Sequence, residues 1–197
     1  MMNPDVLRRR ISEIDDGGEF TDLPRAQAFS VIGPPPRSHD IIYTTKVRVT
    51  SQLFQAIGND CSVGMLGRYG LPDDHDIPWI VDFVRGKAVY FLGDCDPFDL
   101  LVFAWLRRSI PIEFLGISDA IITTLGVRVD NATTIPLAAE EERALVLLRE
   151  VLPEFPTLIG PTCAELLSAN RKLELEVIVS RATKPLAGVL GLLPKNA

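Results

Sequence analysis

Cysteine and histidine are scarce in this sequence, and their scarcity excludes several kinds of site. The 197 residues include three cysteines, Cys61, Cys95 and Cys163, and no two of them form a CxxC pair. This usage is typical of a reducing compartment and excludes a zinc ribbon or knuckle, so we expect a cytoplasmic protein. With two histidines in total, the chain offers little material for a histidine-rich metal site or a Ser/His/Asp triad.

Long apolar runs and blocks of positive charge are also missing. A membrane-spanning helix needs about 18–20 apolar residues, and the apolar run at residues 100–106 is far shorter. No apolar segment of the secretory type follows Arg8, Arg9 and Arg10. We therefore expect no membrane association. The formal net charge is −6 with no strongly basic region, which argues against strong non-specific binding of nucleic acid.

Common nucleotide-binding and hydrolase motifs are absent as well. The sequence has no GxxxxGK[ST] loop and no GxSxG elbow. Gly64, Gly67 and Gly70 recur at every third position, which is not the spacing of a dinucleotide-binding loop. The acidic residues are therefore the remaining candidates for a functional site.

From residue 41 onward, strand-like and helix-like segments alternate. Strands are predicted over 41–49, 61–66, 87–92 and 110–117, and helices over 52–57, 73–84, 98–108 and 118–125. This alternation is typical of an α/β domain, and we expect a four-stranded, mainly parallel sheet with helices on both faces. Further C-terminal helices are predicted over 138–152, 161–169, 173–181 and 185–192.

Residues 1–39 do not follow this pattern. One helix is predicted over 5–14, and the run Gly33-Pro34-Pro35-Pro36 is too stiff to join a strand ladder. We interpret residues 1–39 as an N-terminal extension or linker, and residues 40–197 as one domain with a C-terminal helical portion.

The segment with the clearest chemistry is Gly93-Asp94-Cys95-Asp96-Pro97-Phe98, where a buried strand ends and a helix begins. Ligands of open parallel sheets bind at the carboxyl ends of the strands, and two carboxylates placed there are suited to share Mg²⁺. The alternative is that Asp96 caps the helix ahead of Pro97 and Asp94 ends the strand. Both roles are compatible, since one carboxylate oxygen can cap while the other coordinates.

This segment resembles the Asp-x-Asp-Pro-Tyr/Phe motif of the Toprim domain in the topoisomerase VI A subunit and its meiotic double-strand-break relatives. Other segments match in the same order: Ile41-Ile42-Tyr43-Thr44-Thr45-Lys46 is similar to the family's first strand, Gly67-Arg68-Tyr69-Gly70-Leu71-Pro72-Asp73 to its Gly-Lys-Gly-Tyr-Pro-Asp turn, and Ile112-Glu113-Phe114-Leu115-Gly116-Ile117-Ser118-Asp119 to its fourth strand. The resemblance covers residues 40–190 and implies a Toprim-like fold for residues 40–197.

The resemblance also implies a set of metal ligands. In that family a Glu at the end of the first strand and the two later Asp residues hold the cation. Asp94 and Asp96 are therefore expected to bind Mg²⁺, and Thr45 stands where the family has the Glu, which weakens the site. Asp99 is the candidate third carboxylate, with the alternative that it favours the helix dipole.

Two basic residues and the tyrosines complete the comparison. Arg68 and Lys46, in the matching turn and strand end, are the candidate contacts to nucleic-acid phosphates, with the alternative that Arg68 is simply exposed on the surface. DNA-cleaving members also need a nucleophilic tyrosine on a preceding winged-helix domain. Tyr43, Tyr69 and Tyr90 all lie inside the Toprim-like stretch, so we expect no covalent cleavage by this chain alone.

Three functions remain open at this point. The first is a degenerate, stand-alone Toprim-type protein with a weakened divalent-cation site, which binds nucleic acid or a protein partner without cleaving. The second is a metal-independent interaction protein whose apolar segment 186–193 forms a homo-oligomer interface. The third is a small metal-dependent Toprim nuclease, which needs a general base that the sequence does not reveal.

Overall fold

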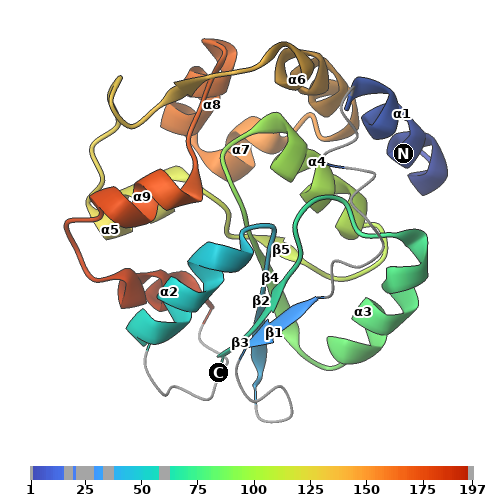
Figure 1. Cartoon of the computed structure of the whole chain (residues 1–197), viewed down its shortest axis with the longest axis horizontal. Coiled ribbons are helices and arrows are strands. Elements are labelled where there is room, and N and C mark those ends of the chain that lie inside the picture. The colour runs from blue at the N-terminus through green and yellow to red at the C-terminus, as the bar shows by residue number, and fades with distance from the viewer. Residues whose placement is uncertain (1, 16–19, 21–28, 33–37, 58–62, 195–197) are drawn as a thin grey trace.

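A mixed β-sheet forms the centre of the molecule. The computed structural model describes residues 2–15, 20, 29–32, 38–57 and 63–194. In this part of the chain the sheet has five strands in the order β1-β3-β2-β4-β5, and β1 alone is antiparallel (Figure 1). The strands are β1 (Ser30–Ile32), β2 (Asp40–Thr44), β3 (Val63–Gly67), β4 (Ala88–Leu92) and β5 (Glu113–Phe114). The predicted α/β class with a mainly parallel sheet is confirmed.

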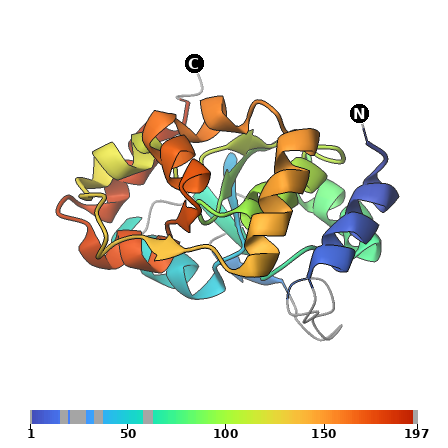
Figure 2. The same cartoon turned by 90° about the horizontal axis from the view of Figure 1, so that it is seen from above.

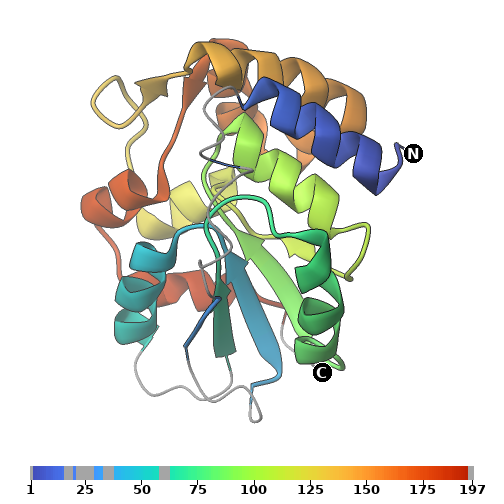
Figure 3. The same cartoon turned by 45° about the vertical axis from the view of Figure 1, so that its right-hand side comes forward.

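Helices cover both faces of this sheet (Figures 1 and 3). One face carries α2 (Val47–Ile57), α5 (Asp119–Leu125) and the 3₁₀ helix η3 (Leu186–Leu192); the other carries α3 (Ile77–Phe83), which follows the 3₁₀ turn η2 (Asp74–Asp76), and α4 (Pro97–Leu106). The remaining elements are α7 (Phe155–Ile159), α8 (Pro161–Ser168), α9 (Leu175–Arg181) and the antiparallel pair β6 (Ile135–Pro136) and β7 (Arg171–Lys172).

Helix α4 is buried along its whole length. It lies between the sheet and an outer layer formed by α1 (Pro4–Ile14) and α6 (Ala139–Val151), which run side by side over it (Figures 2 and 3). Its sequence is apolar on all sides except for Asp99, as a helix covered on both faces requires. The first turn of α4 is therefore held rigidly against the end of β4. None of the described helices has the length and apolar character needed to cross a bilayer.

The described parts of residues 1–39 belong to the same core. Leu7 and Ile11 of α1 are fully buried, and β1 pairs with β3 at the edge of the sheet. The boundary expected at residue 40 is thus not a boundary in packing, and the sheet has a fifth strand that was not predicted. Three residues are too few to display the alternation that identifies a strand. The proline run lies outside the described residues.

The strand predicted over 41–49 is shorter in the structure. It ends at Thr44, and α2 begins at Val47. The Thr44 hydroxyl accepts a hydrogen bond of 3.0 Å from the Lys46 N–H and so turns the chain. The β-branched Val47 and Val49 look strand-like locally, but they begin a helix. The strand predicted over 110–117 likewise pairs only at Glu113–Phe114.

Candidate metal centre

The candidate site lies where β2 and β4 end side by side. These strands are parallel neighbours with Thr44 opposite Leu92, so Thr45 and Gly93 leave the sheet at the same edge. After β2 the chain passes through α2 to β3 on one side, and after β4 it passes through α4 on the opposite face to β5 on the other side. Open α/β sheets bind ligands at such switch points.

Three carboxylates meet at this point: Asp94, Asp96 and Asp99, called the acid cluster below. One oxygen from each lies within 4.8 Å of the others. Their exposed fractions are 1%, 6% and 3%, so water solvates them little. Asp96 is the N-cap of α4, and its Oδ1 accepts a hydrogen bond of 2.8 Å from the Asp99 N–H. The cap thus positions the third carboxylate, and capping and clustering occur together.

A network of hydrogen bonds holds the cluster in place. Asp99 Oδ2 accepts bonds from the Thr45 hydroxyl at 2.7 Å and from the Asp94 N–H at 2.6 Å. A Cβ atom on Gly93 would lie 2.7 Å from that same oxygen, so the approach requires glycine. Thr45, at the position of the expected glutamate, therefore serves as a hydrogen-bond donor to one of the acids.

The cluster is also bonded to the C-terminal region. Asp94 Oδ1 accepts a bond of 2.7 Å from the Leu175 N–H at the start of α9. Next to it, the backbones of Cys95 and Leu173 pair in an isolated antiparallel bridge. The acids of the β4–α4 loop thereby join the sheet to a segment about 80 residues later, and nothing local in the sequence indicates this contact.

The two predicted phosphate contacts are both engaged within the protein. Lys46 Nζ lies 2.5 Å from Asp94 Oδ2, and its side chain is 18% exposed. Arg68 pairs with Asp76, and its guanidinium carbon lies 5.2 Å from the centre of the Phe29 ring. A phosphate group would therefore compete with a carboxylate for each cation.

Burial controls the protonation of the cluster. It raises the pKa of Asp96 to about 7, and the charge of Asp99 adds to this while the hydrogen bond from the Asp99 N–H and the Lys46 charge oppose it. Burial and the neighbouring acids also raise the pKa of Asp94 well above its ordinary value, although Lys46 opposes the shift. Burial would lower the pKa of Lys46, but the charges of Asp99 and Asp94 raise it. The site therefore favours protons or another cation.

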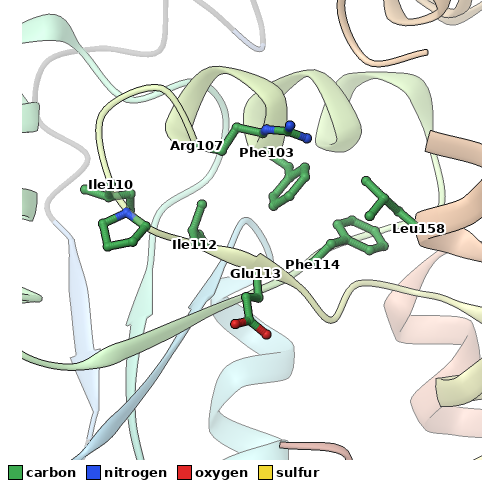
Figure 4. Close-up of a pocket in the computed structure, with 8 residues that line it drawn as sticks. Phe103, Arg107, Ile110, Ile112, Glu113, Phe114 and Leu158 are labelled. Carbon is green, nitrogen blue, oxygen red and sulfur yellow. The ribbon is translucent and has the colours of Figure 1, made fainter. Parts of the chain in front are cut away.

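A cavity lies near the C-terminal end of α4. It measures about 470 Å³ and lies between the end of α4 and β5 (Figure 4). The rings of Phe103 and Phe114 meet edge to face in it, with centres 5.1 Å apart. Its basic side chain, Arg107, is paired with Glu154 at 2.7 Å. Its lining includes none of the three acids, so it is not part of the candidate centre.

The apolar C-terminal segment is accounted for within the chain. Val189 and Leu193 are buried, and η3 packs against α2 and α5. Leu186, Leu190 and Leu192 are partly buried against the same core. A homo-oligomer interface at this segment stays a prediction.

The sequence was also compared with known proteins. It matches no protein-family model and no curated protein. The resemblance to the Toprim domain accordingly stays a prediction that rests on the motifs of residues 41–119.

Proposed function

We propose that this chain is a non-cleaving, Toprim-like protein that binds a divalent cation, Mg²⁺ or Mn²⁺, at the acid cluster. The proposal rests on the approach of three buried carboxylates to within 4.8 Å of one another beside the switch point of the sheet. Carboxylate oxygens are the protein ligands that Mg²⁺ prefers, and the ion usually keeps several waters.

The charges of the cluster are consistent with such an ion. When all three carboxylates are ionised, the ammonium of Lys46 leaves two negative charges uncompensated, which a divalent cation would neutralise. The raised pKa values of Asp94 and Asp96 mean that the ion must displace protons. Its affinity should therefore increase with pH. Thr45 contributes a neutral hydroxyl, which supports weak binding.

The placement of the tyrosines supports a protein that does not cleave. Tyr43 and Tyr90 are buried within β2 and β4, and Tyr69 lies in the turn after β3. None lies on a separate domain of the kind that the resemblance implies for the nucleophile. Because Lys46 and Arg68 are already paired, the proposal assigns them no contact with nucleic acid.

Calorimetric titration with Mn²⁺ tests the proposal. We expect weak binding to the wild type and binding about tenfold weaker or worse in Asp96→Asn, since one ligand loses its charge. Thr45→Glu should tighten binding because it adds a carboxylate at the edge of the cluster. Glu165→Gln, which neutralises an exposed acid on α8, is the matched control. Identical heats for the wild type and Asp96→Asn would overturn the proposal.

The second candidate is a metal-independent interaction protein in which the cluster is structural. The observation that favours it is that the protein itself already stabilises two of the carboxylates. Lys46 pairs with Asp94, and Asp99 accepts hydrogen bonds from the Thr45 hydroxyl and the Asp94 N–H. In that case Mg²⁺ should leave the melting temperature of the wild type unchanged. A rise that is absent from Asp96→Asn would favour the cation-binding protein.

A further inference from the structure

A second cavity lies beside the acid cluster and has a different character. Its volume is about 400 Å³. Phe98 in its wall follows Asp96 by two residues, and Glu174 precedes Leu175, whose N–H binds Asp94. The cavity is thus at the carboxyl edge of the sheet, with walls from the turn after β3, the first turns of α4 and α6, and the β7–α9 junction. Small organic ligands occupy cavities of roughly 300–1,000 Å³, and an inorganic ion needs far less.

One wall of this cavity is aromatic. The rings of Phe20 and Phe98 lie with their centres 4.9 Å apart, and the Tyr69 ring meets Phe20 edge to face at 6.4 Å. Tyr69 is 39% exposed, so part of its ring is accessible from solvent at this cavity. Such rings offer apolar contact to an alkyl chain and a negative π-face to a cation.

The charged groups of the cavity are mostly acidic. Its lining contains four carboxylates and one ammonium group: Asp15, Glu140, Glu141, Glu174 and Lys172. Lys172 is already paired, at 2.6 Å with Glu141 and at 3.6 Å with Glu174. In the described part of the chain, Glu140 has no ion pair or hydrogen bond through its side chain. Because the lining holds four carboxylates and a single ammonium group, its excess of negative charge disfavours a phosphate or carboxylate ligand.

We propose that this cavity binds a small organic cation, an alkylammonium or alkylguanidinium group. Its charged head would lie toward Glu140, and its alkyl chain along the rings of Phe20, Phe98 and Tyr69. Aromatic faces combined with carboxylates are the means by which proteins recognise such cations. A free amine and a lysine or arginine side chain share this chemistry. The inference goes beyond the divalent-cation site and does not require a metal at the acid cluster.

The test compares three probes of equal length on the full chain in EDTA at neutral pH: pentylammonium, pentanol and pentanoate. Binding is followed by ligand-observed NMR. We expect pentylammonium to bind about tenfold or more tightly than pentanol, and pentanoate not to bind, because the cavity is acidic. Equal binding of all three probes would overturn the proposal, since the charges would then contribute nothing.

Variants locate the binding. Tyr69→Leu and Glu140→Gln should each weaken pentylammonium binding about fivefold or more, whereas Glu165→Gln, the same charge change on exposed α8, should not. If Asp96→Asn abolishes amine binding and Tyr69→Leu does not, the amine occupies the acid cluster and the proposal fails. The Mn²⁺ titration of Asp96→Asn tests the divalent-cation site independently of amine binding. Agmatine and a capped Gly-Lys-Gly peptide then distinguish a free amine from a side chain: the tighter of the two identifies the source, and binding of neither overturns the proposal.

Discussion

Replacing Asp96 with asparagine should stabilise the protein at neutral pH when no divalent cation is present. Asparagine and aspartate cap helices equally well, so Asp96→Asn keeps the hydrogen bond from the Asp99 N–H that starts α4. The substitution removes only a buried carboxylate whose pKa is raised to about 7, first by burial and then by the charge of Asp99.

The raised pKa of Asp96 makes the unfolding free energy of the wild type fall as the pH rises. Because the folded-state pKa of Asp96 lies above its ordinary value of 3.8, the carboxyl group favours folding at low pH, and this contribution is lost as the pH rises through 7. The difference between the two values corresponds to about 4 kcal/mol of unfolding free energy. Asparagine does not titrate, so the wild type should lose stability relative to Asp96→Asn over this interval by an amount of that order.

Urea unfolding of both proteins between about pH 4 and 8 measures this difference. In EDTA the two stability curves should diverge as the pH rises, with the variant the more stable above neutrality. Mg²⁺ should raise the unfolding free energy of the wild type by about 2.7 kcal/mol when its concentration is a hundredfold above its dissociation constant. It should not stabilise the variant. Parallel curves in EDTA would refute the reasoning, because Asp96 would then ionise without a penalty.

Three further changes test the network around the cluster. Lys46→Met leaves Asp94 buried without its partner and should lower the unfolding free energy by about 3–5 kcal/mol at neutral pH, and by less in acid, where Asp94 is protonated; equal losses at both pH values would contradict this. Gly93→Ala places a Cβ 2.7 Å from Asp99 Oδ2 and 2.8 Å from the Phe91 ring, so it should cost about 1–3 kcal/mol and weaken Mn²⁺ binding, whereas Gly191→Ala, where a Cβ meets nothing within 4 Å, should be tolerated. Asp119→Ala removes the acceptor of the Thr162 and Cys163 N–H groups at the start of α8 and should cost about 2 kcal/mol in urea unfolding. Burial raises the pKa of Asp119, but the hydrogen bonds from Thr162 and Cys163 lower it more. The loss of stability in Asp119→Ala should therefore become smaller as the pH falls through the pKa of Asp119 in the folded protein.

The features that sequence could predict are those specified by neighbouring residues. Asp96 before Pro97 indicates a helix start, and α4 begins there with Asp96 as its cap. Asp73 in the same way caps the turn that precedes α3. The meeting of Thr45 with the β4–α4 loop also follows from sequence, because parallel strands carry their carboxyl ends to one edge.

The features that sequence could not predict depend on residues far apart in the chain. Lys46 was expected to contact phosphate, and only the folded chain brings its ammonium onto Asp94. The bond from the Leu175 N–H to Asp94 comes from a backbone group, which every residue except proline possesses, so no residue type identifies it. Strand β1 is equally hidden, since three residues pair only because β3 offers an open edge.

The amide of Leu175 gives the protein a built-in reporter. The Leu175 N–H donates to Asp94, which Lys46 also contacts. An event that protonates Asp94 or binds a cation to it should therefore change the strength of the hydrogen bond between α9 and the loop after β4. The rate at which the Leu175 amide hydrogen exchanges with solvent deuterium should therefore change when a cation occupies the cluster. The C-terminal helices would then loosen or tighten in step with a charge that lies about 80 positions earlier in the chain.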